Sequence, residues 1–153
     1  MAYATQADVE SACGGADRLV QLADWDRDGI ADAPRIADAI AKADALIDSF
    51  AGKRFHVPFS PVPAVIAQHS ATLAKLAMAR RRGQLTQDEQ DEWDSIVSTD
   101  EKKPGWLLLL ARGVVTPGGD PLPTAHSTMQ NDFADTVMPG DRDAARDKLG
   151  GFW

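Results

Sequence analysis

Apolar residues recur every three or four positions over much of the chain, and this spacing predicts helices. Between residues 34 and 51 the steps are four, three, four and three, which puts one apolar stripe along a helix. The stripe consists of Ile36, Ile40, Ala43, Ile47 and Phe50. A second long helix is expected from about residue 62 to 82, with Ile66, His69, Leu73 and Leu76 on its stripe and Gly83 at its end. In that position His69 is expected to be a packed or interface residue.

Shorter helices are expected on either side of this pair. Thr5 with Asp8 is a capping signal for a helix that stops at Gly14, and residues 19–22 continue as a turn or a short helix. Thr86 with Glu89 forms a capping box that opens another helix. Residues 106–111 are a compact apolar run, which we interpret as a helix, with a strand as the alternative. The fold class is therefore all-α: a small helical bundle with two long helices.

Two segments interrupt the helical pattern. Residues 53–63 contain three prolines, which forbid a continuous helix and hold the backbone extended, so we expect a stiff connector that carries Phe55 and Phe59. From Thr116 onward the chain has too little periodic apolar content for a core of its own. These patterns predict a helical domain over residues 1–115 and an extended arm over residues 116–153.

The arm nevertheless carries apolar residues spaced like anchors. They are Met129, Phe133, Val137, Met138, Leu149, Phe152 and Trp153. We favour docking of the arm on a neighbouring subunit, and the alternative is an arm folded back on its own domain.

An acidic loop precedes the first long helix. Asp24, Asp26, Asp28 and Asp32 occupy its first, third, fifth and ninth positions, and a glycine stands at the sixth. This pattern is typical of a Ca²⁺ loop, in which Ile30 would offer only its backbone carbonyl. The twelfth position holds arginine where a bidentate glutamate is expected, so binding would be weak, with a Kd of roughly 10⁻⁴ to 10⁻³ M. The alternative is a solvated turn in which Asp32 caps the next helix; both interpretations can hold together.

Composition limits the classes of function. With 153 residues and 44% hydrophobic content, the chain suits one domain plus a tail, and no run approaches the length of a membrane span. No secretory signal is apparent, so synthesis in the cytoplasm is expected. The net charge of −7 disfavours broad binding of nucleic acid. The single cysteine, Cys13, excludes an internal disulfide, and we expect it to be partly buried on a short helix.

A basic cluster ends the second long helix. Arg80, Arg81 and Arg82 stand where cations favour the helix dipole, and contact with an acidic partner is the alternative interpretation.

The segment from Tyr3 to Gly113 resembles the head–tail connector (adaptor) proteins of tailed bacteriophages, in particular the family of Mu-like phages and prophages. The resemblance depends on the order and spacing of several pieces: residues 3–5, the acidic loop, residues 39–44 and 47–50, and Lys53-Arg54-Phe55 followed by Val57-Pro58. Phe55 stands where that family usually has tyrosine, and residues 98–106 look like an insertion. The arm aligns only through Arg146, Leu149 and Phe152.

The resemblance implies a structural role in the virion and no catalysis. Such proteins form a ring, usually twelvefold, beneath the portal and present the surface for a stopper, a tail terminator or the tail. Net negative charge would let DNA pass through the lumen without binding. We expect ring and partner contacts at Arg54, Phe55, Phe59, Arg80, Arg81, Arg82, Phe133, Leu149, Phe152 and Trp153.

Two rival functions come from other classes. One is a small calcium-binding interaction module, in which Ca²⁺ orders the acidic loop; otherwise no cofactor is required. The other is a hydrolase, which we disfavour because no nucleophile stands beside a base and no glycine-rich phosphate loop is present.

Overall fold

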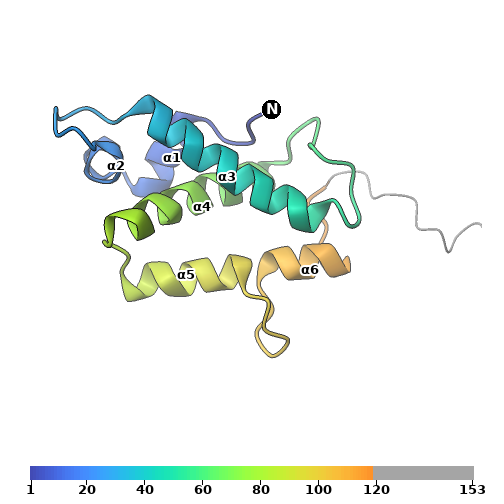
Figure 1. Ribbon diagram of the computed structural model, residues 1–153. Helices are drawn as coiled ribbons and strands as arrows, with labels where there is room; N and C mark the ends of the chain where they lie inside the picture. Colours follow the sequence, from blue (N-terminus) through green and yellow to red (C-terminus); the bar gives the residue numbers. More distant parts are fainter. Residues whose placement is uncertain (119–153) are drawn as a thin grey trace, which may run out of the picture. The chain divides into compact units, whose positions relative to one another are not determined.

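The computed structural model describes residues 1–118, which form six helices and no strand (Figure 1). The helices are α1 (Gln6–Cys13), α2 (Ala16–Ala23), α3 (Ala33–Ala51), α4 (Ala64–Arg82), α5 (Gln87–Val97) and α6 (Trp106–Arg112). The all-α expectation is confirmed for this part of the chain. Among these helices none is long and apolar enough to span a membrane. The expected arm, apart from its first three residues, lies outside the described residues.

The two longest helices, α3 and α4, have 19 residues each and pack against one another. Four residues of the expected α3 stripe, Ile36, Ile40, Ala43 and Ile47, are buried, whereas Phe50 is half-buried. On α4 the apolar stripe residues Ile66, Leu73 and Leu76 are buried as well. Each fully buried isoleucine or leucine contributes roughly 1.5–3 kcal/mol of transfer free energy. This pair of helices is therefore the centre of the core, with α1 and α2 on α4 and α5 on the side of α4 away from α3 (Figure 1).

Local side-chain chemistry sets where several helices begin and end. Thr86 with Glu89 forms the predicted capping box, and the predicted cap at Thr5 is also a capping box, with Asp8. Each pair satisfies two free N–H groups of its helix. Gly83 follows α4 in the left-handed conformation, with φ of 65°, which only glycine adopts at little cost.

A buried polar network ties the N-terminal segment and the proline connector to α3 and α4. The carboxylate of Asp44 accepts hydrogen bonds from the Tyr3 N–H, at 3.0 Å, and from the Ser70 hydroxyl. The Tyr3 hydroxyl donates to Asp48 and accepts from the Phe59 N–H, at 3.1 Å. Because buried polar groups are costly unless paired, this network fixes the register of four chain segments.

The connector joins α3 to α4 and contains cis peptide bonds at Val57–Pro58 and Ser60–Pro61. Partner contacts were expected at Phe55 and Phe59 of this connector. The side chains of these residues are instead buried, with only 2% and 3% of their surface exposed. Phe59 packs against the rings of both Tyr3 and Phe55. Burial in the core leaves these two side chains almost no surface for a partner, so they stabilise the subunit itself.

The segment from residue 98 to 105 leads from α5 into α6. It closes on itself where the Gly105 N–H donates to the Ser98 carbonyl, at 2.8 Å. A Cβ at Gly105 would lie 2.5 Å from the Ser98 nitrogen and 2.8 Å from the Ile96 carbonyl oxygen, so the backbone can approach this closely only at a glycine. Residues 106–112 form the predicted helix, not a strand, and α6 packs on α3 and α5.

Candidate functional site

The acidic loop between α2 and α3 brings three of its carboxylates together. Oxygen atoms of Asp24, Asp26 and Asp28 lie within 4.8 Å of one another. Asp32 is the N-cap residue of α3, as predicted, but its carboxylate makes no capping bond and accepts instead from the Trp25 N–H, at 3.1 Å. The exposed side chain of Ile30 offers no ligand atom.

Backbone N–H groups of the loop donate hydrogen bonds to the loop's own carboxylates. Asp24 accepts from the N–H of Arg27, at 2.6 Å, and of Gly29, at 3.0 Å, and Asp28 accepts from Ile30, at 2.7 Å. These bonds hold a turn in which Arg27 and Gly29 have positive φ values of 66° and 84°. The protein itself therefore orders the loop, and the same oxygens would have to be shared with any bound cation.

The pKa shifts of Asp24 and Asp26 reflect the short distances between the loop carboxylates and their N–H donors. Desolvation acts to raise the pKa of Asp24, but the N–H groups that it accepts outweigh this effect and lower it. For Asp26 the bond from the Asp28 N–H acts to lower the pKa, but desolvation and the carboxylates of Asp28 and Asp32 together raise it. The carboxylates of the loop thus repel one another, as carboxylates in a cation site do. They also remain in contact with water, as in an ordinary exposed turn.

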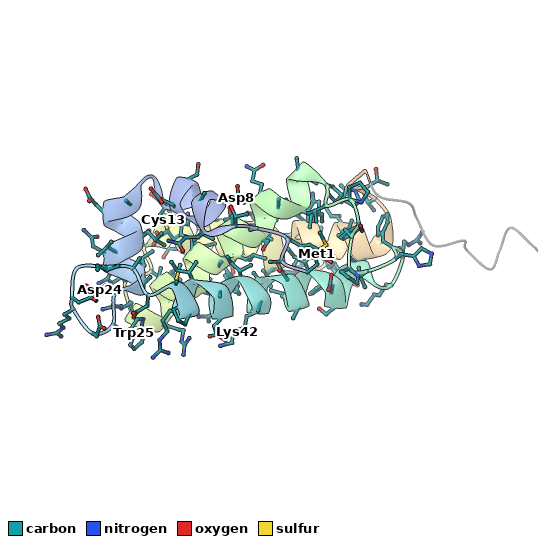
Figure 2. All side chains as sticks on the ribbon, turned by 90° about the horizontal axis from the view of Figure 1, so that it is seen from above. Met1, Asp8, Cys13, Asp24, Trp25 and Lys42 are labelled. Carbon is teal, nitrogen blue, oxygen red and sulfur yellow. The ribbon has the colours of Figure 1, made fainter. Side chains whose placement is uncertain are left out.

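A second cluster lies beside the loop and was not predicted as a unit. Three guanidinium groups surround the indole of Trp25: those of Arg82, Arg35 and Arg81, at 5.0, 5.2 and 5.8 Å from the ring centroid. Trp25 is 44% exposed, and Figure 2 shows it with Asp24 at one end of the helical body. We call these four residues the arginine–tryptophan patch.

The arginines at the end of α4 differ in how they are held. Arg82 is half-buried: its Nε donates to the Leu22 carbonyl, at 3.3 Å, and one terminal nitrogen is buried without a partner among residues 1–118. Arg81 is exposed and forms an ion pair with Asp38, at 3.4 Å. Arg80 stacks over Trp93 on α5, at 5.6 Å from the ring centroid. The helix-end position of these residues was predictable, but their aromatic partners were not.

The other residues predicted at interfaces are not members of this patch. Arg54 is exposed on the connector. Phe133, Leu149, Phe152 and Trp153 lie outside the described residues.

A third surface, which sequence reasoning missed, is the outer face of α5. Asp88, Asp91 and Asp94 are exposed and follow one another at three-residue intervals, so they share one side of the helix. Asp91 and Asp94 line a hollow of about 690 Å³ together with the segment that precedes α6. The three-residue spacing in Asp-Glu-Gln-Asp-Glu-Trp-Asp was the available signal. We call Asp88, Asp91 and Asp94 the acidic face.

Comparison with protein-family models shows to which family the chain belongs. The family model described as Bacteriophage Mu, Gp36 matches residues 3–134. The chain belongs to this bacteriophage Mu Gp36 family. No curated protein and no solved structure gives a significant match.

Membership in the Gp36 family confirms the resemblance to Mu-like phage proteins and places the chain among phage structural or morphogenesis proteins. The reactive side chains fit the packed roles that the sequence indicated. His69 is half-buried against Trp106, with ring centroids 4.2 Å apart, and burial lowers its pKa. Cys13 is partly buried on α1, and burial raises the pKa of its thiol, which disfavours the reactive thiolate.

Proposed function

We propose that this Gp36-family chain is a head–tail connector (adaptor) protein with a purely structural role. Its subunits form a ring, twelvefold by expectation, between the portal and the tail or stopper in the neck of the phage particle. The observation that carries the proposal is the family match over residues 3–134, which includes the whole described helical body.

The subunit has the physical properties that such a ring needs. A closed ring of head-to-tail copies requires two different complementary faces held at a constant angle. The Asp44 network and the packing of α3 on α4 make the body a fixed block. The chain's net charge of −7 favours a lumen that DNA phosphates do not bind.

The test is a phage or prophage of this type from which the gene has been disabled. We expect DNA-filled heads and separate tails in electron micrographs, and restoration of whole virions when the chain is supplied in trans. Normal, infectious virions without the protein would refute the connector role. Loss of heads, with tails intact, would instead point to an earlier step in head assembly.

A truncation addresses the arm. Removing residues 150–153 deletes Phe152 and Trp153, which we propose dock on a neighbouring subunit or component. The truncated chain should keep the circular dichroism spectrum and melting temperature of the full chain, yet fail to support tail attachment. Unimpaired virion assembly by this variant would remove the docking role of the arm.

A further inference from the structure

Two of the three guanidinium groups of the arginine–tryptophan patch have no carboxylate partner among residues 1–118. Three guanidinium groups lie within 5.8 Å of one indole centroid, and only Arg81 has a carboxylate partner, Asp38, among residues 1–118. Like charges held this close repel one another, although water screens the exposed ones. An anionic group that approached from solvent would relieve this repulsion.

The neighbouring acidic loop does not supply that group. Its carboxylates accept hydrogen bonds from the loop's own N–H groups, and within the described part of the chain none forms an ion pair with an arginine. Asp26 and Asp32 do line a shallow hollow of about 460 Å³ with Trp25, Pro34 and Arg35. The hollow is therefore lined by groups of both charges, with the exposed guanidinium groups of Arg35 and Arg81 near Trp25.

The acidic face has the opposite imbalance. Asp91 and Asp94 accept hydrogen bonds from Gln87 and Gln90, at 2.9 and 3.0 Å, and Asp88 has no side-chain bond among residues 1–118. None of the three aspartates has a cationic partner there. Their repulsion along one side of α5 destabilises the isolated helix slightly.

The two surfaces can belong to one head-to-tail contact. Arg35 is on α3, whereas the acidic face is on α5, and these helices pack on different sides of α4 (Figure 1). The surfaces share no residue. A contact between them would thus be heterologous, the type that generates rings when the rotation closes.

We propose that the arginine–tryptophan patch of one copy docks on the acidic face of α5 of the next copy. This inference rests on the ring proposed above and names its subunit interface. Tryptophan and arginine are the side chains that most often dominate interface energies, and opposite charge on the facing helix selects the partner and its orientation. The hollow beside Asp91 and Asp94, which a third carboxylate, Asp100, and one cation, Lys103, also line, gives the indole and guanidinium groups room to enter.

The experiment uses the full chain and two charge reversals. Arg35→Glu/Arg81→Glu reverses the patch, and Asp91→Lys/Asp94→Lys reverses the acidic face. Arg82 is left unchanged because its Nε holds the Leu22 carbonyl. The control, Lys53→Glu, reverses one exposed lysine on the connector, which contributes to neither surface and has no ion pair among residues 1–118.

Self-association is measured by sedimentation equilibrium in about 50 mM and about 500 mM NaCl, and circular dichroism melting verifies that each variant is folded. We expect each reversal alone to weaken association by at least about tenfold and added salt to weaken it in the wild type. An equimolar mixture of the two reversed variants should regain association, because the reversed patch meets the reversed face. The control should behave as the wild type.

Three results would overturn the inference: a wild-type chain that stays monomeric up to about 1 mM in low salt, reversal variants that associate normally, or a mixture that does not recover. Failure of the connector role itself has a separate signature. It appears as normal virions after loss of the gene, whatever the chain does in the centrifuge.

Discussion

Replacing Tyr3 by phenylalanine removes one hydroxyl from the buried network and leaves the packing nearly unchanged. Tyr3 is 5% exposed, and its ring lies 5.9 Å from that of Phe59, a contact that phenylalanine keeps. The hydroxyl that is lost donates to Asp48 and accepts the Phe59 N–H. Tyr3→Phe therefore isolates the polar contribution of the network.

The expected cost follows from these two bonds. A hydrogen bond to a charged acceptor contributes about 1.5–3 kcal/mol, and a buried N–H left without a partner costs about 1–3 kcal/mol. Asp48 is half-exposed, so water replaces part of the first bond. We expect Tyr3→Phe to destabilise the protein by about 2–3 kcal/mol, which lowers the melting temperature by roughly 10 °C for a domain of this size.

The same hydroxyl gives the stability a specific pH dependence. Burial, followed by the hydrogen bond to Asp48, raises the pKa of Tyr3 above its ordinary value of 10.0 and outweighs the lowering effect of the Phe59 N–H. The unfolded chain loses the proton of the Tyr3 hydroxyl near pH 10, whereas the folded chain keeps it. The stabilisation is therefore complete below pH 10 and is lost above it, at no more than about 1.4 kcal/mol per pH unit.

Urea unfolding at a series of pH values measures both effects. Because Tyr3 is the only tyrosine, tyrosinate absorbance reports its ionisation alone. The control is Ser49→Ala, which removes an exposed hydroxyl whose one hydrogen bond within residues 1–118 is to the Leu46 carbonyl and should change stability by less than about 0.5 kcal/mol. A wild-type urea midpoint for Tyr3→Phe, or tyrosinate formation near pH 10 in the folded protein, would contradict this role of the Tyr3 hydroxyl.

Three further changes test other parts of the structure. Gly105→Ala should cost about 1–3 kcal/mol in urea unfolding, because its Cβ would meet backbone atoms 2.5–2.9 Å away; an unchanged midpoint would contradict that close approach. Burial lowers the pKa of His69, so wild type should lose stability as the pH falls from about 7 towards 5, relative to His69→Leu; parallel pH profiles of the two proteins would refute this. In calorimetry, Ca²⁺ should bind the acidic loop with a Kd no lower than about 10⁻⁴ M. Binding with a micromolar Kd that Asp26→Asn/Asp28→Asn abolishes would favour the calcium-binding module.

Features that depend on local sequence were predictable. The apolar spacing along α3 and the glycine after α4 predicted the ends of these two helices to within about two residues. Such local signals suffice because helical periodicity and capping act within a few positions. The cap at Thr5 and the capping box of Thr86 with Glu89 were predicted for the same reason. The helix of residues 106–112 was the favoured of two alternatives, and its two glycine boundaries at 105 and 113 agree with it.

Features that depend on long-range contacts were not predictable. The partners in the buried network are 41 positions apart for Tyr3 and Asp44 and 26 for Ser70 and Asp44. Phe59 was expected to contact a partner, because nothing in its own segment shows that its N–H will donate to the Tyr3 hydroxyl in the core. Likewise, Trp25 was treated only as a loop residue, although arginines from two helices converge on it.

Two contacts between α4 and α5 matter for the proposed ring. In a closed ring every copy repeats the same rotation, so a small error in the angle between the two faces of a subunit accumulates around the ring. The patch is built on α3 and the end of α4, and the acidic face on α5, which Arg80 joins to α4 by its stack over Trp93. The ion pair of Lys75 with Glu92, at 2.7 Å, adds a second link between these helices. Contacts that fix α5 on α4 therefore also fix the angle between the proposed docking surfaces, and Trp93→Ala should weaken assembly even though Trp93 lies on neither surface.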